Sequence, residues 1–160
     1  MSRRPIPTSA NLGCTRQGEA VEHLFRGEAQ LRSVKLVLPC VDDQSIDFGY
    51  IKNNRLRGIQ VKSTNADVSR TKDDSRRYQF KLIPDGRVKQ GHTVLGVNTA
   101  SVFVLYIIPE DMWFIIPCEE IGERKLLSLS VCDGEVKTAR WQPYLDGWDL
   151  LRDVDTATAG

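Results

Sequence analysis

The spacing of apolar residues changes along the 160-residue chain. Between Thr15 or Arg16 and about Arg32, apolar positions recur with a period near 3.6, which predicts an amphipathic helix. Beyond it, short runs alternate apolar with polar residues or are apolar throughout, and both patterns predict strands. The expected strands cover residues 33–39, two arms within 46–63, 78–83, 101–108 and 112–117. A helical turn over 118–123 and a closing helix over 143–152 follow.

This order of elements predicts a mixed α/β domain with one central sheet. Residues 63–77 are polar and charged, so we expect a loop there between two strands. We assign residues 15–152 to a single domain, with a flexible arm at 1–14 before it and a frayed tail at 153–160 after it.

The stretch 46–63, IDFGYIKNNRLRGIQVKS, predicts a β-hairpin. Asn53 and Asn54 suit its turn, because Asn tolerates the positive φ that a two-residue type I′ loop requires. With this turn the numbers of cross-strand partners sum to 107, so Asp47 lies opposite Gln60. Side chains alternate between the two faces of a strand. The expected polar face carries Ser45, Asp47, Gln60 and Lys62, and the expected apolar face carries Ile46, Phe48, Ile59 and Val61.

The polar face of this hairpin has the residue types of a magnesium site. A carboxylate opposite an amide carbonyl offers two hard oxygens about 5 Å apart at the backbone, which suits Mg²⁺. The ammonium of Lys62, two residues along, could stabilise negative charge that develops on a phosphate or help to deprotonate a metal-bound water. The same spacing also fits a solvated sheet face on which Asp47 and Lys62 simply pair.

Charge is distributed unevenly along a chain whose net charge is only +1. Residues 51–90 hold eleven Lys or Arg and four Asp, a local balance of +7 that leaves −6 for the rest. This asymmetry fits a surface that faces a polyanion, or a solvated basic loop. The chain has no apolar run of membrane-spanning length and no signal-peptide core, so we expect a cytoplasmic protein without membrane contact. The four cysteines are irregularly spaced, which favours free thiols over a zinc site.

Several motifs, taken in order, resemble the PD-(D/E)XK nuclease superfamily. The string QVKS at 60–63 resembles the Gln-x-Lys motif of the branch that includes group I intron-associated endonucleases. The segment GEAVEHLFRGEAQL resembles the first helix of the superfamily. SVFVLYIIPEDMWFIIPCEEI resembles its later strand pair, and RWQPYLDGWDLLR its closing helix. The resemblance runs from about residue 16 to 152 and implies a restriction-endonuclease-like fold, a mixed β-sheet flanked by helices.

The resemblance also implies roles for particular residues. Asp47 would be the metal ligand, Gln60 a second ligand or water-orienting group, and Lys62 the charge stabiliser. A backbone carbonyl near Val61 would add a third ligand. Glu22 is the best match for the carboxylate of the first helix, with Glu19 and Glu28 as rivals. The expected cofactor is Mg²⁺, with Mn²⁺ as a substitute. Gln60 departs from the acid of most family members, and it brings no charge to the metal.

Residues after the hairpin are candidates for contacts with DNA. Hydroxyl and basic side chains bind phosphate oxygens, although a strand end and a solubilising loop fit these residues as well. The candidates are Ser63, Thr64, Arg70, Lys72, Arg76 and Arg77. The leading hypothesis is a Mg²⁺-dependent DNA endonuclease that acts as a homodimer or higher homo-oligomer. The alternatives are a nucleic-acid-binding module with weak or no activity on the same fold, and a protein-interaction domain.

Overall fold

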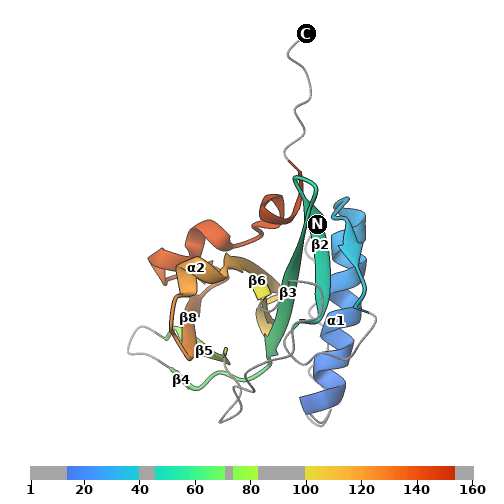
Figure 1. Ribbon diagram of the computed structural model, residues 1–160. Coiled ribbons are helices and arrows are strands. Elements are labelled where there is room, and N and C mark those ends of the chain that lie inside the picture. The colour runs from blue at the N-terminus through green and yellow to red at the C-terminus, as the bar shows by residue number, and fades with distance from the viewer. Residues whose placement is uncertain (1–13, 40–45, 71–73, 83–99, 154–160) are drawn as a thin grey trace.

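One long helix and two β-sheets make up the layers of this protein (Figure 1). The computed structural model describes residues 14–39, 46–70, 74–82 and 100–153. The five-stranded sheet has the order β1 (Leu36–Val37), β2 (Phe48–Lys52), β3 (Arg55–Thr64), β6 (Ala100–Ile107) and β7 (Met112–Pro117). The four-stranded sheet has the order β4 (Ser69–Arg70), β5 (Arg76–Lys81), β8 (Leu126–Cys132) and β9 (Glu135–Val136). The helices are α1 (Cys14–Leu31), α2 (Cys118–Ile121) and three 3-10 helices, η1 (Ile108–Glu110), η2 (Ala139–Tyr144) and η3 (Trp148–Leu151).

The predicted hairpin is confirmed in its turn and in its register from Phe48 with Ile59 onward, whereas the predicted pairing of Asp47 with Gln60 is not part of the ladder. Asn53 and Asn54 have φ values of 52° and 57°, as a type I′ turn requires. Paired residues of β2 and β3 run from Phe48 with Ile59 to Lys52 with Arg55, so their numbers sum to 107. β3 then pairs with β6 in parallel, which makes the first sheet mixed.

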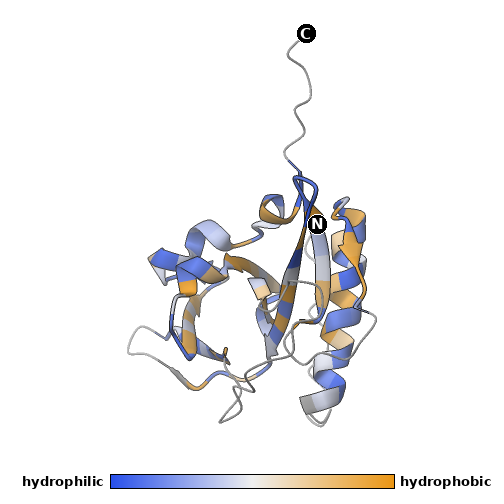
Figure 2. Cartoon of the chain, in the orientation of Figure 1, coloured by the Kyte–Doolittle hydropathy of each residue, from blue (hydrophilic) through white to orange (hydrophobic). Residues whose placement is uncertain are grey.

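Two apolar cores lie on opposite faces of the first sheet. On one face, α1 contributes Val21, Phe25 and Ala29 to a core that also contains Trp113 and Trp148. On the other face, the second sheet covers the β6–β7 half of the first. Because β6 is buried from both sides, its sequence is apolar at nearly every position, whereas β3 alternates between hydrophilic and hydrophobic residues (Figure 2). Trp141 is buried as well, so all three tryptophans belong to the core.

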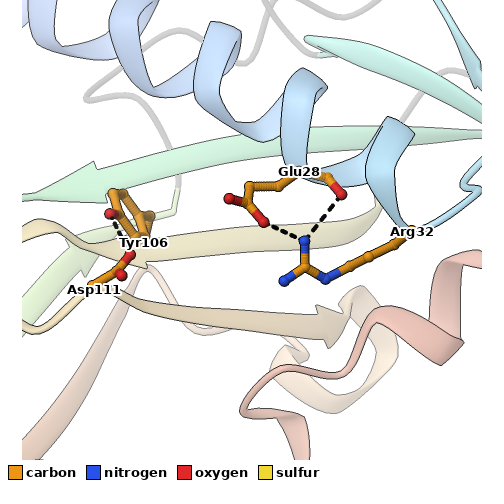
Figure 3. A network of polar contacts seen from close by, with 4 residues as sticks. All are labelled: Glu28, Arg32, Tyr106 and Asp111. Atoms are coloured by element: carbon orange, nitrogen blue, oxygen red, sulfur yellow. Dashed lines mark hydrogen bonds and ion pairs between the residues drawn. The ribbon is translucent and has the colours of Figure 1, made fainter. Parts of the chain in front are cut away.

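Glu28 is a buried carboxylate on α1 that pairs with Arg32 just after the end of the helix. Arg32, one turn later, donates to both the carboxylate and the backbone carbonyl of Glu28 (Figure 3). The guanidinium of Arg32 also lies 4.5 Å from the centre of the Trp148 ring. The same figure shows the Tyr106 hydroxyl donating to Asp111 at 2.8 Å, which ties β6 to the turn before β7. The contact of Arg32 with Trp148 joins the end of α1 to the C-terminal segment.

The expectation of one central sheet is wrong. The strand predicted at 78–83 is β5, and it joins the second sheet, because β6 occupies the place beside β3. The second sheet also contains β8 and β9, for which the sequence analysis assigned no element, and β4, which lies inside the predicted 63–77 loop. The signal for β8 was present, since Leu127, Leu129 and Val131 alternate with polar residues.

The closing helix predicted over 143–152 is also wrong. η2 and η3 take its place, because Pro143 lacks a backbone donor, Asp146 has a φ of 51° and Gly147 follows it. Leu151 and Trp148 of η3 still pack in the core under α1. The predicted strand at 33–39 shortens to the two residues of β1.

Some predictions lie outside the described residues. They concern the arm at 1–13, Cys40, Ser45, Lys72 and most of the tail, and the described part also omits the side chains of Cys14 and Arg70. None of the helices within the described ranges has the length and hydropathy needed to cross a bilayer.

Candidate active site

Gln60 and Lys62 project from the face of the first sheet that is turned toward the second sheet. Their partners on β6 are Phe103 and Leu105, which pack with the core between the two sheets. The intervening Val61 packs instead with the core under α1. Gln60 is buried at 8% exposure, and Lys62 is half-buried. The alternation predicted for β3 therefore holds, with Gln60 and Lys62 on the face turned toward the second sheet.

Asp47 lies where the β2–β3 ladder ends, at the residue before β2. Its carboxylate Oδ2 accepts a hydrogen bond from the backbone N–H of Val61 at 2.6 Å. Its own N–H donates to the carbonyl of Ile59 at 2.9 Å, so it departs from the regular pairing opposite Gln60. The carboxylate thus takes the place of a backbone acceptor beside β3. This bond orients Asp47 while leaving lone pairs of its carboxylate for another ligand.

α1 brings a second carboxylate to this place. Glu22 follows the buried Val21 and is half-buried on the helix. It interacts electrostatically with both Asp47 and Lys62. Of its rivals, Glu28 is engaged by Arg32, and Glu19 is exposed on the first turns of the helix. The structure therefore groups Glu22, Asp47 and Lys62, and it separates Glu28 from them.

Both carboxyl groups of this cluster are less acidic than usual. Burial raises the pKa of Asp47 above its ordinary value of 3.8, and the hydrogen bond from Val61 and the charge of Lys62 only partly offset that rise. Burial also raises the pKa of Glu22, and the negative charge of Asp47 raises it further. Two carboxylates that disfavour each other's charge are an arrangement that a bound cation would relieve.

The donor set fits a hard divalent cation that takes part of its coordination from elsewhere. Two carboxylates, the Gln60 amide oxygen and a strand carbonyl are oxygen donors of the kind that Mg²⁺ binds. Within the described residues, no group of three or more His, Cys, Asp or Glu side chains is arranged to hold a metal. Mg²⁺ usually keeps several waters and is held by one or two carboxylates together with substrate phosphates, so this sparse set is compatible with it.

Ser63 and Thr64, predicted together as phosphate contacts, lie on opposite faces of β3. Thr64 pairs with Ile107 on the side of Lys62, whereas Ser63 pairs with Tyr106 on the side of α1. The Ser63 hydroxyl accepts a hydrogen bond from Nε2 of Gln17 at 3.3 Å. Gln17 was not among the predicted site residues, although its position four residues before Val21, on the buried side of the helix, was a usable signal.

The two candidate arginines of β5 also project from opposite faces. Arg76 lies 3.6 Å from the Glu110 carboxylate, which also accepts a hydrogen bond from the Tyr78 hydroxyl at 2.7 Å. Arg77 is exposed on the outer face of the second sheet, opposite Ser130. The two side chains therefore present their charges on different faces of the second sheet. Glu110, which partly offsets the charge of Arg76, gave no signal in the sequence.

The fold is similar to that of a solved nuclease. The structure of a bacterial homing endonuclease, I-Ssp6803I, matches with a TM-score of 0.62 and 18% sequence identity, over 87% of this chain and 91% of that one. The two proteins share a fold. The expected mixed α/β architecture, with a mixed sheet flanked by helices, is thus confirmed. No family model matches the chain, and no curated protein matches its sequence.

The raised pKa of Asp47 predicts a pH-dependent effect of removing its charge. The native state binds the proton more tightly than the unfolded chain, so stability falls as pH rises from the ordinary value of 3.8 through the raised pKa. Asp47→Asn removes this charge but keeps an oxygen for the Val61 N–H. We expect Asp47→Asn to have a higher free energy of unfolding than the wild type at neutral pH. This difference should disappear at a pH below 3.8, the ordinary pKa of an aspartate.

Urea unfolding at a series of pH values measures this effect, with Asp67→Asn as the control on an exposed site. A variant at Asp47 that is less stable than the wild type at neutral pH would contradict the electrostatic explanation.

Proposed function

We propose that this protein is a DNA endonuclease of the PD-(D/E)XK type that hydrolyses phosphodiester bonds with Mg²⁺. The observation that carries the proposal is the electrostatic interaction of Glu22 with both Asp47 and Lys62, which brings two carboxyl groups and a lysine into one cluster beside β3. The shared fold with a homing endonuclease supports it. Gln60, buried beside this group on the same strand face, completes the set that the Gln-x-Lys motif requires.

The chemistry of each residue suggests its role in the proposed reaction. Asp47, oriented by the Val61 N–H, would hold the cation, and Glu22, the Gln60 amide oxygen and a carbonyl near Val61 would help to hold it. When bound, Mg²⁺ would polarise the phosphate and supply an acidic water as the nucleophile. Lys62 places a positive charge on the same face and would stabilise the negative charge that accumulates on the phosphoryl oxygens in the transition state. Burial of the Gln60 side chain would keep its amide in one orientation.

The second candidate function is a nucleic-acid-binding module that keeps the fold and has weak or no activity. One observation favours it. Gln60 is uncharged, and the described residues hold no cluster of three acids for a metal. Binding of DNA without Mg²⁺-dependent cleavage would identify this alternative.

A cut through both strands of DNA needs two such sites, so we propose a homodimer or higher homo-oligomer. Leu56 lies on the strand face that carries Gln60 and Lys62, and it is 44% exposed. It packs over Gly49 together with Val37, which is 36% exposed. This aliphatic pair lies toward the turn of the β2–β3 hairpin, and it suits contact with a second copy of the chain better than contact with phosphates.

Cleavage of supercoiled plasmid in Mg²⁺ tests the proposed function. Lys62→Met keeps the aliphatic stem and removes the charge, so we expect a cleavage rate about 10²–10³-fold lower. Asp47→Ala is expected to lose a similar factor, because it removes the best-oriented oxygen donor. Lys81→Met, an exposed lysine of β5, is the matched control and is expected to keep wild-type activity. Wild-type cleavage by Lys62→Met and Asp47→Ala would refute the site assignment.

The salt dependence of DNA binding distinguishes the two arginines of β5. Arg77→Ala is expected to make the slope of log affinity against log salt less steep by about 0.9, as for one lost phosphate contact. Arg76→Ala is expected to change it less, because Glu110 already offsets part of its charge. Fluorescence anisotropy of a labelled duplex in a KCl series measures both slopes. Equal changes in the two variants would argue against this distinction.

The state of association tests the proposed contact between copies. Leu56→Lys places a charge in the aliphatic pair, so we expect a shift toward monomer in sedimentation velocity. Leu126→Lys is the matched control, since Leu126 is also 44% exposed but lies on the second sheet. A wild-type protein that is monomeric on DNA, or a Leu56→Lys variant that still associates, would rule out this surface.

A further inference from the structure

The first turn of α1 is joined to the strand that carries the candidate site. Nε2 of Gln17 donates to Oγ of Ser63 at 3.3 Å, and both residues are half-buried. Ser63 directly follows Lys62 along β3, and its side chain points to the opposite face. The bond therefore lies behind the site, between helix and sheet, where a DNA phosphate at Lys62 would not meet the serine hydroxyl.

The position of this bond along the helix relates it to Glu22. α1 is one continuous helix of 18 residues, so Glu22 lies about 7.5 Å along the axis from Gln17. The contacts of Val21 and Phe25 with the core under α1 are apolar and non-directional, and they tolerate small shifts of the helix along the sheet. A hydrogen bond is directional, so it restricts such shifts. Its partner strand is the one that carries Gln60 and Lys62.

We propose that Gln17 is a positioning residue whose bond to Ser63 sets the distance between Glu22 and Asp47. The inference rests on the proposed function, since it concerns the same cation site. It assigns Ser63 to the support of the helix and leaves Thr64, on the face of Lys62, as the hydroxyl that can meet a phosphate in place of its exposed bond to the Ala66 carbonyl. Gln17 and Ser63 touch neither the cation nor DNA, and they act through Glu22.

Binding of Mn²⁺ alone to the full chain, measured by isothermal titration calorimetry, tests the inference. Gln17→Met keeps the size of the side chain without its donor, and Ser63→Ala removes the acceptor. Each is expected to weaken Mn²⁺ binding about twofold to tenfold, the range of one net hydrogen bond. The double variant is expected to lose no more than either single one, because the two changes remove the same bond. Ser63→Thr keeps a hydroxyl and is expected to restore the affinity.

A second measurement separates positioning from contact with DNA. Duplex affinity without metal is expected to stay at the wild-type level in Gln17→Met and Ser63→Ala, and to fall in Thr64→Val, which changes a hydroxyl on the other face. Thermal unfolding of each variant checks that the domain remains folded. Loss of metal-free DNA affinity in Ser63→Ala, or losses of Mn²⁺ affinity that add in the double variant, would overturn the inference.

Failure of the proposed function gives a different result. If the wild type neither binds Mn²⁺ nor cleaves DNA, the proposed function falls and the inference falls with it. If the wild type binds and cleaves while Gln17→Met and Ser63→Ala match it in Mn²⁺ affinity, only the inference falls.

Discussion

The hydrogen bond from the Val61 N–H to Asp47 Oδ2, at 2.6 Å, is the contact on which the candidate site depends. It replaces a backbone acceptor at the end of the β2–β3 ladder, so the carboxylate is fixed by the same strand that presents Gln60 and Lys62. β3 is itself held between β2 and β6, one antiparallel and one parallel neighbour. A carboxylate tied to a central strand has little freedom to move, as preorganised catalysis requires.

This arrangement has an electrostatic cost, which is seen in the raised pKa values of its carboxyl groups. Burial raises the pKa of both Asp47 and Glu22, and Glu22 is raised further by Asp47. The buried helix carboxylate Glu28 is, by contrast, matched by Arg32. Like charges gathered near Lys62, in contrast to the matched pair of Glu28 and Arg32, are typical of a binding site for a cation.

Local sequence patterns predicted the parts of the site that lie within one hairpin. They did not predict the contacts between segments that are distant in the sequence. The Asn53-Asn54 turn alone fixed which side chains of β3 share a face, and the structure agrees. The second sheet could not be predicted from the alternation of residues 78–83, because a strand pattern does not say which sheet the strand joins. The spacing of apolar residues likewise did not predict the contact of Ser63 with Gln17 or that of Arg76 with Glu110, since the partners are 46 and 34 residues apart in the sequence.

The most direct measurement of the central claim is the anomalous scattering of Mn²⁺ in a crystal of the protein bound to duplex DNA. If Asp47 is the first ligand of a catalytic cation, a peak will lie about 2.2 Å from its carboxylate, between the protein and a DNA phosphate, with Lys62 beside that phosphate. Bound DNA with no Mn²⁺ peak at Asp47, or with its phosphates away from Lys62, would contradict the claim.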